Sequence, residues 1–296
     1  MVAGDGTFHV ASEKDDADLF WAIRGGGGNF GVVTRFHYRL HPVDQIVGGL
    51  LLLPATEDTI VKVIAASEQA PEELTAIVNV MPAPPMPFVP ESQHGKLVLM
   101  ILLCHAGDAE SGARVLAPFR SIAEPIADLV RPMTYPEIFP PEDDSYHPTA
   151  VGRTLFINRV DRNSATTIMD FLGRSDAAMR VAQLRVLGGA MARVPVDATA
   201  FAHRQNRILV NVAAFYNGDE ERPRRQQWID AFAAALNQGT PGAYSAFIND
   251  EGPERVSAAY PTATFARLAA VKRQYDPGNL FRRNHNIPPA PVHKPR

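Results

Sequence analysis

Residues 24–34 read RGGGGNFGVVT and contain the spacing G-x-G-x-x-G from Gly26 onward. In a dinucleotide-binding Rossmann unit this spacing follows a strand and opens a helix. Here the order is reversed, because residues 16–24 (DADLFWAIR) have the apolar spacing of a short helix and residues 32–40 (VVTRFHYRL) alternate like a strand. We therefore predict a helix-to-strand turn whose bare backbone lies against a flat or anionic group.

Four consecutive glycines also fit a flexible linker. However, Asn29-Phe30-Gly31 leads directly into the apolar segment that begins at Val32. A linker does not need such close anchoring, so we favour a rigid backbone contact site.

A second informative segment lies near the other end, where residues 260–289 read YPTATFARLAAVKRQYDPGNLFRRNHNIPP. Its apolar residues and one lysine recur at helical spacing, and Asp276-Pro277-Gly278 ends the helix. These positions are Phe265, Leu268, Val271, Lys272 and Tyr275.

Together, DLFWAIRGGGGNFGVVT (18–34) and FARLAAVKRQYDPGNLFRRNHNIPP (265–289) resemble the FAD-linked oxidases of the berberine bridge enzyme-like type, in the vanillyl-alcohol oxidase superfamily. Members of that family begin with a flavin-binding subdomain that carries a linkable histidine, often a cysteine, and a glycine-rich pyrophosphate loop. Residues 1–10 resemble the hairpin that follows this subdomain. We therefore expect the rear two-thirds of an oxidase that binds FAD poorly by itself.

The pattern of elements predicts an α+β fold, in which helices cover an antiparallel-sheet substrate domain inserted between remnants of the FAD-binding domain. The expected segments are 1–41 (FAD-domain remnant), 42–250 (substrate domain) and 251–296 (a C-terminal berberine-like segment). Expected strands are 46–54, 74–81, 96–104, 179–187 and 208–216, and expected helices are 56–70, 108–117, 164–172 and 220–236. The proline-rich stretch 82–90 predicts an exposed loop, and Cys104 is expected to be a buried small hydrophobe.

The resemblance also implies where a cofactor and a catalytic base would lie. The resemblance implies that the glycine loop contacts FAD, with Tyr244 near the flavin edge. The loop residues concerned are Gly27, Gly28, Asn29, Phe30, Gly31 and Val32. The family base is commonly the second tyrosine of A-Y-x-N-Y, which aligns with residues 243–247 (AYSAF). Phe247 replaces that base, and Phe265 replaces the tyrosine of the family's N-Y-x-R-L segment.

A phenyl ring cannot transfer a proton, so the remaining catalytic candidates are Tyr244, Tyr260 and, behind them, His203. The resemblance places residues 199–204 (TAFAHR) near the family's active site, so His203 and Arg204 could face substrate, and the alternative is a solvated pair at a strand edge. In the family, a small organic substrate loses hydride to flavin while a protein base removes a proton, and molecular oxygen reoxidises the flavin.

Composition excludes several other functions. The 296 residues carry a net charge of −3, which gives no field for nucleic acid or an anionic membrane. No apolar run approaches the ~20 residues of a membrane span, and the single cysteine favours the cytoplasm. The acidic run 142–144 lacks the spacing of metal ligands, so we expect a loop there and no metal site.

Two functions stay open from the sequence. The first is an FAD-dependent oxidase acting on a small organic molecule and lacking its front part. The second is a non-catalytic remnant that binds a small molecule or a partner. In either case, apolar surface that the front subdomain covers in the family would be exposed here, so we expect self-association or a missing N-terminal partner.

Overall fold

The computed structural model describes residues 1–43, 45–139, 147–248, 252–283 and 285–291. The chain divides into two compact units. Unit 1 comprises Met1–Leu40, Ala190–Gln205 and Pro241–Arg296, and unit 2 comprises His41–Gly189 and Asn206–Thr240. Residues 190–205 and 241–248, which fall within the expected domain 42–250, belong to unit 1 in this division. The expected boundary at residue 250 and the acidic run 142–144 lie outside the described residues.

Unit 2 is built on an antiparallel sheet, which confirms the predicted fold class. Among the described residues, eight strands pair in the order β4-β1-β3-β2-β7-β8-β6, with β5 beside β1. The strands are β1 Ile46–Pro54, β2 Leu74–Pro82, β3 Leu97–His105, β4 Ala127–Asp128, β5 Arg131–Met133, β6 Thr149–Ile157, β7 Arg180–Val186 and β8 Ile208–Tyr216.

The register of the sheet places buried apolar residues in one row across five strand pairings. Because side chains of paired residues point to the same face, this row forms a continuous apolar surface. From β1 to β6 it runs Leu51, Ile101, Val78, Leu184, Val210 and Leu155.

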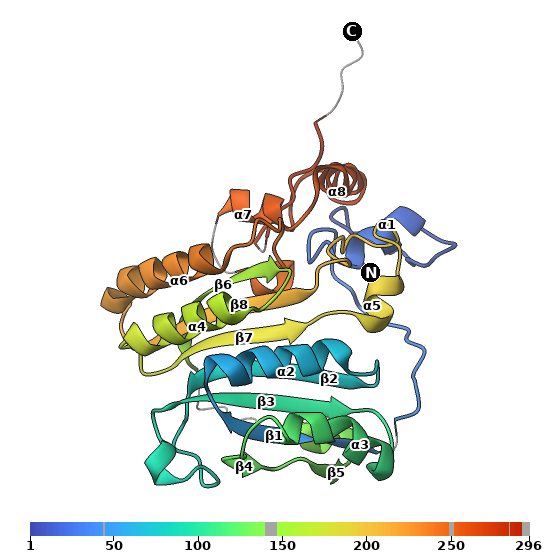
Figure 1. Cartoon of the computed structure of the whole chain (residues 1–296). Coiled ribbons are helices and arrows are strands. Elements are labelled where there is room, and N and C mark those ends of the chain that lie inside the picture. The colour runs from blue at the N-terminus through green and yellow to red at the C-terminus, as the bar shows by residue number, and fades with distance from the viewer. Residues whose placement is uncertain (44, 140–146, 249–251, 284, 292–296) are drawn as a thin grey trace. The chain divides into compact units, whose positions relative to one another are not determined.

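Four helices of unit 2 form a layer on one face of this sheet (Figure 1). They are α2 Glu57–Gln69, α3 Ala109–Arg120, α4 Arg162–Arg174 and α6 Arg222–Leu236. Helix α2 begins as predicted, because the Thr56 hydroxyl accepts a hydrogen bond from the Thr59 amide. The short 3-10 helices are η1 Glu91–Gln93, η2 Tyr135–Ile138, η3 Asp219–Glu221 and η4 Ser245–Phe247.

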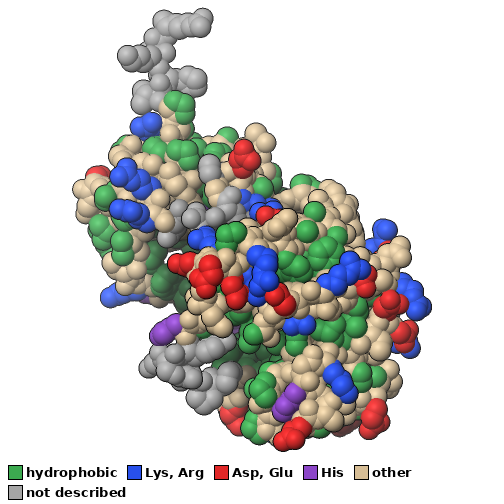
Figure 2. Space-filling view, turned by 90° about the vertical axis from the view of Figure 1, so that its left-hand side faces the viewer, with side chains coloured by type: hydrophobic (Ala, Val, Ile, Leu, Met, Phe, Trp, Pro, Cys, Tyr) green, Lys and Arg blue, Asp and Glu red, His purple; other side chains and the backbone are tan. Residues whose placement is uncertain are grey.

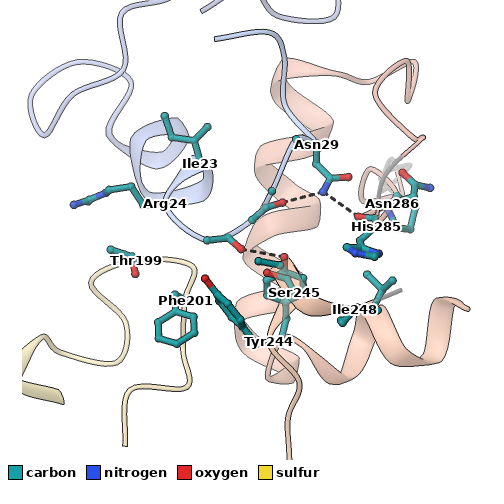
Figure 3. A pocket seen from close by; sticks show the side chains of 18 of the residues that line it. Ile23, Arg24, Asn29, Thr199, Phe201, Tyr244, Ser245, Ile248, His285 and Asn286 are labelled. Carbon is teal, nitrogen blue, oxygen red and sulfur yellow. Dashed lines mark hydrogen bonds between the residues drawn. The ribbon is translucent and has the colours of Figure 1, made fainter. Parts of the chain in front are cut away.

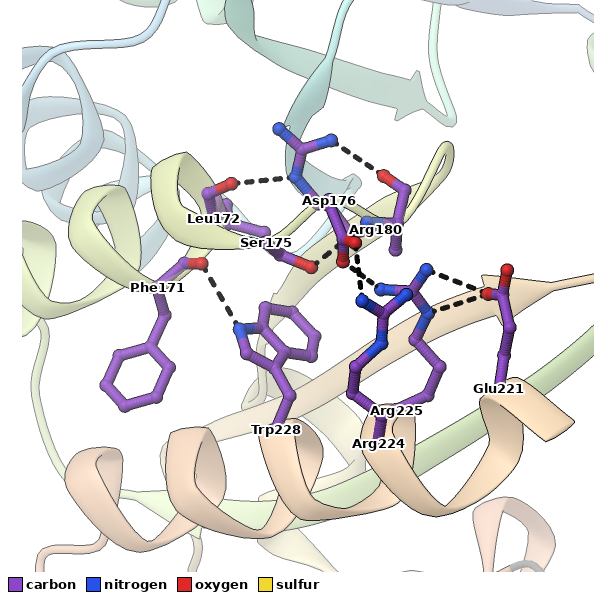
Figure 4. A network of polar contacts seen from close by, with 10 residues as sticks. Phe171, Leu172, Ser175, Asp176, Arg180, Glu221, Arg224, Arg225 and Trp228 are labelled. Atoms are coloured by element: carbon purple, nitrogen blue, oxygen red, sulfur yellow. Dashed lines mark hydrogen bonds and ion pairs between the residues drawn. The ribbon is translucent and has the colours of Figure 1, made fainter.

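A polar network joins the end of α4 to the start of α6 within unit 2 (Figure 4). Arg225 is almost fully buried and donates to both Asp176 and Glu221. Arg224 donates to the same Asp176 carboxylate at 2.8 Å. Because two guanidinium groups converge on it, Asp176 has a pKa below its ordinary value, with the Arg225 hydrogen bond as the largest cause.

Charges of both signs are interspersed on the face of the molecule in Figure 2, and neither sign gathers into one patch. Several exposed pairs lie one helical turn apart, such as Lys62 with Asp58 and Arg114 with Glu110. Such pairs add little to stability.

Unit 1 contains helices packed around a separate apolar core. They are α1 Ala17–Ile23, α7 Pro253–Ala258 and α8 Thr262–Tyr275, and α5 Gly189–Arg193 lies in unit 1 except for its first residue. Leu19 of α1 and Leu268 of α8 are fully buried in this core. The predicted helix 16–24 and the predicted stop after Tyr275 are both confirmed.

Three expectations were wrong. Residues 32–40 form no strand: only Val32 bridges to Val2, and a strand needs a partner along its length to satisfy its backbone groups. Pro82 ends β2, and residues 83–90 form a loop in which Ala83 and Val89 are buried. Cys104 is half-buried on β3 rather than fully buried, and partial burial raises the pKa of its thiol.

In the described part of the chain, no helix combines the length and the apolar character that a bilayer crossing requires.

Candidate functional site

The glycine loop follows α1 directly and is closely packed, which excludes a flexible linker. Gly25 has a φ of +133°, and a Cβ atom there would lie 2.3 Å from the Phe201 amide nitrogen. Gly31 has a φ of +154°, and a Cβ atom there would lie 2.3 Å from the Val2 carbonyl oxygen. No other residue type fits these two positions without moving the backbone.

The side chain of Asn29 fastens the loop to the C-terminal segment. Its Nδ2 donates to the carbonyl oxygens of Gly26 (2.8 Å) and His285 (3.0 Å). Its Oδ1 accepts from the Ile287 amide at 2.9 Å. Asn29 is buried, so these bonds hold the loop in one conformation.

A buried ion pair contacts the loop at the Asn29 carbonyl oxygen. Lys272 is fully buried, and its Nζ donates to the Asn29 carbonyl oxygen (2.6 Å), Asp276 Oδ2 (2.5 Å) and the Phe281 carbonyl oxygen (2.8 Å). Asp276 also accepts from the Leu280 and Phe281 amides. Burial raises the pKa of the Asp276 carboxyl, but the Lys272 ammonium and these amides outweigh it and leave the pKa below its ordinary value.

The loop forms one wall of a cavity of about 1390 Å³ within unit 1 (Figure 3). The cavity's described lining includes arginine, histidine and aromatic side chains but no carboxylate. The lining includes Arg24, the loop 25–29, Thr199, Phe201, Arg204, Tyr244, Ser245, Tyr260, Arg283, His285 and Asn286.

Both candidate tyrosines line this cavity, but their hydroxyls differ. Tyr260 is buried, and its hydroxyl donates to the Gly25 carbonyl oxygen at 3.0 Å. Burial raises the pKa of Tyr260, against a smaller lowering by a hydrogen bond with Ser245. Tyr244 is half-buried, with its ring edge-on to Phe201 at 5.8 Å between centroids, and no described group hydrogen-bonds to its hydroxyl.

The third catalytic candidate lies apart from the cavity lining. The Nε2 atom of His203 lies 2.8 Å from the Ala259 carbonyl oxygen. Burial lowers the pKa of His203, partly offset by that carbonyl. A half-buried ring in contact with Gly242 and Ala259 is a structural element of unit 1, rather than a solvated strand edge.

The predicted cofactor-binding residues separate into two groups. Gly27, Gly28 and Asn29 line the cavity together with Tyr244. Phe30 is buried in the core of unit 1, Gly31 packs against Val2, and Val32 pairs with Val2. Arg204, which the sequence singled out together with His203 as able to face substrate, lines the cavity. The sequence did not reveal Asn286 as a lining residue. Lys272 stood out by its helical spacing, but its pairing with Asp276 one turn later was not recognised.

Comparison with known proteins gives this geometry a context. A family model described as "Berberine and berberine like" matches residues 243–288, which include Tyr244, Tyr260 and the ion pair. The chain is 27% identical over 302 residues to an FAD-linked oxidoreductase of Dictyostelium discoideum, covering 98% of this chain and 62% of that protein. These matches support the resemblance to the berberine bridge enzyme-like proteins of the vanillyl-alcohol oxidase superfamily. The chain is also 24% identical to (R)-6-hydroxynicotine oxidase of Paenarthrobacter nicotinovorans, covering 98% of this chain and 64% of that enzyme.

Solved structures show the same fold at lower identity. BBE-like 1 of Physcomitrella patens has a TM-score of 0.82 at 19% identity, covering 99% of this chain and 65% of that protein. The 6-hydroxy-D-nicotine oxidase of Arthrobacter nicotinovorans has a TM-score of 0.79 at 22% identity, covering 98% and 65%. The chain thus spans less than two thirds of the length of these relatives.

Proposed function

We propose that this chain forms the substrate side of an FAD-dependent oxidoreductase that oxidises a small organic molecule. The observation that supports the proposal is the cavity in unit 1, where the rigid glycine loop and Tyr244 face the same space. The relatives named FAD-linked oxidoreductase and oxidase match nearly all of this chain.

The cavity residues fit a large planar ligand with polar edges. Gly27 and Gly28 expose backbone without side chains, which permits close approach of a flat or phosphorylated group. Asn286 Oδ1 and Arg204 Nε are buried without a hydrogen-bond partner in the described chain, so one acceptor and one donor are available in the lining. When bound, FAD would supply the hydride acceptor.

The protein's own groups would position the substrate and take its proton. Tyr244 is the candidate for that proton, because its hydroxyl has no competing hydrogen bond in the described chain. Tyr260 is committed to the Gly25 carbonyl, and burial favours its neutral form. Its proposed role is to hold the loop.

Adding FAD to the purified chain tests the cofactor part of this proposal. We expect the chain to purify colourless and to bind added FAD weakly, with a measurable change in flavin fluorescence. Gly27→Trp, which fills the exposed face of the loop, should abolish that change, whereas Gly95→Trp in an open surface turn of unit 2 should not. The same fluorescence change in the parent and in Gly27→Trp would contradict binding at the loop.

A second function, association with another polypeptide, is favoured by the exposed apolar side chains of residues 32–40. Phe36 and Tyr38 stack on each other with their ring centroids 5.6 Å apart, and they are 61% and 75% exposed. An exposed apolar stretch of this kind is typical of an interaction surface.

A further inference from the structure

Arg204 is a buried cation without an acidic partner. It is only 8% exposed, and no described carboxylate pairs with it. Burial lowers the pKa of Arg204, and the nearby cation Arg24 lowers it further. Burying an unpaired charge is energetically unfavourable. A guanidinium in this state therefore indicates a role other than stabilising the fold.

The guanidinium is held in place on one side only. Its Nη2 donates to the buried Thr199 hydroxyl at 2.7 Å, and its Nη1 donates to the Met191 carbonyl oxygen at 3.3 Å. Its Nε is buried and has no partner in the described chain. Arginine has five N–H donors in a planar fork that matches the two oxygens of a carboxylate or phosphate. These two bonds therefore leave three of the five N–H donors unused.

Aromatic rings stand beside this cation in the cavity lining. The guanidinium carbon of Arg204 lies 5.4 Å from the centre of the Phe201 ring, and Tyr244 contacts Phe201 edge-on. Arg24 and Arg283 also line the cavity, and the described lining contains no Asp or Glu. This side of the cavity therefore combines flat apolar surface with positive charge.

We propose that Arg204 binds an anionic group on a planar aromatic ligand in this cavity. The anion is a carboxylate or phenolate of the organic substrate, or a phosphate or ring anion of a flavin. This inference rests on the proposed function for placing a ligand in the cavity, and it does not require that ligand to be a flavin. Thr199 and Met191 act as positioning residues that aim the guanidinium.

Pairs of probes with similar shape but different charge show how much the charge contributes to binding affinity. Binding to the full chain is measured by calorimetry with 4-hydroxybenzoate against 4-hydroxybenzamide, and with FMN against riboflavin. We expect the anionic member of at least one pair to bind about 10- to 100-fold more tightly, as for a hydrogen bond to a charged group. The pair that shows the preference identifies the source of the anion.

Variants of Arg204 test whether this residue causes the tighter binding of the anionic probe. Arg204→Gln should remove it, and Arg204→Lys should retain part of it because the charge remains. The exposed Arg114, which pairs with Glu110 in unit 2, gives a matched control in Arg114→Gln, which should bind like the parent. Equal affinity within both pairs, no binding of any probe, or a preference that survives Arg204→Gln would overturn the proposal. A preference for the benzoate alone would uphold it while removing support for flavin in this cavity.

Thermal unfolding distinguishes a ligand-binding role from a purely structural one. Arg204→Met keeps the aliphatic stem and removes the unpaired charge, so the free chain should unfold at the same or a higher temperature. If Arg204 served only to tie Thr199 to Met191, the same variant would lower the midpoint by several degrees, and the proposal would fail.

Discussion

Two tyrosines face the cavity, and at the scale of single residues their hydroxyls predict different consequences of mutation. Tyr244→Phe removes a hydroxyl that holds no described hydrogen bond, so folding should be unaffected. In a form of the chain completed with a relative's front part and loaded with FAD, flavin reduction by substrate should slow ~10²- to 10⁴-fold, as expected for loss of a general base. Anaerobic bleaching of the flavin absorbance measures this rate.

The matched control is Tyr38→Phe, because Tyr38 is exposed and lies outside the cavity lining. Tyr260→Phe should instead lower the free energy of unfolding by about 0.5–1.5 kcal/mol through loss of the bond to Gly25. An unchanged rate of flavin reduction in Tyr244→Phe would show that another group is the base.

The Lys272–Asp276 pair predicts a pH dependence of stability. The pKa of Asp276 is lower in the folded chain than its ordinary value of 3.8. A carboxyl of this kind stabilises the fold above the ordinary pKa, and the contribution disappears as the pH falls through the folded value. The difference in unfolding free energy between the parent and Asp276→Asn should therefore be largest near neutral pH and shrink below about pH 4.

Chemical denaturation at several pH values checks this difference. Asp170→Asn is a useful control, because the Asp170 carboxylate is exposed on α4 and forms a surface pair with the exposed Arg174. An Asp276→Asn difference that stayed constant down to acidic pH would contradict the assignment of the charged pair.

At the scale of elements, the network in Figure 4 joins α4 to α6 through the Asp176 carboxylate. We expect this carboxylate to contribute more to the free energy of unfolding than a typical surface pair does. Asp176→Asn leaves buried Arg225 with Glu221 alone and should lower the free energy of unfolding more than loss of an exposed pair does. Asp170→Asn removes an exposed pair with Arg174 and should cost less than about 0.5 kcal/mol. Equal losses in thermal or denaturant unfolding would contradict this ranking.

The elements also show what sequence patterns can and cannot predict. Strands β1 and β8 were predicted at their true bounds because long apolar runs identify buried strands. Strand β6 was missed because Gly152 and Arg153 interrupt its pattern. Residues 32–40 have a strand-like alternation, but no pattern within a segment can supply the neighbouring strand that pairing requires.

The candidate site was partly predictable for the same reason. The loop and Tyr244 were found through motifs in single segments. Arg204 was singled out from the sequence as able to face substrate. Its unpaired, buried state depends on Thr199, Phe201 and the loop meeting around one cavity, and these contacts join segments far apart in sequence, as in the bond from Arg24 to Ala198 across 174 residues. Local patterns do not encode such non-local contacts.

At the scale of the whole molecule, the exposed side chains of residues 32–40 predict self-association. Phe36, Tyr38 and Leu40 are all more than 60% exposed, and burying them against a second copy removes apolar surface from water. Light scattering should show assemblies whose proportion rises with concentration. Replacing Phe36 and Tyr38 by serine should shift the chain toward monomer, whereas replacing the exposed Met86 of unit 2 by serine should not. A parent chain that stays monomeric at high concentration would refute this surface as a contact.

The interrupted make-up of unit 1 has a consequence for synthesis on the ribosome. The sheet of unit 2 is complete once residue 240 has emerged, and domains generally fold as units while translation proceeds. The Asn29 carbonyl, by contrast, waits for Lys272, which is made 243 residues later. Until then residues 1–40 lack the part of their core that α8 supplies. Rare codons that slow translation between residues 240 and 272 would prolong this interval without altering a single side chain.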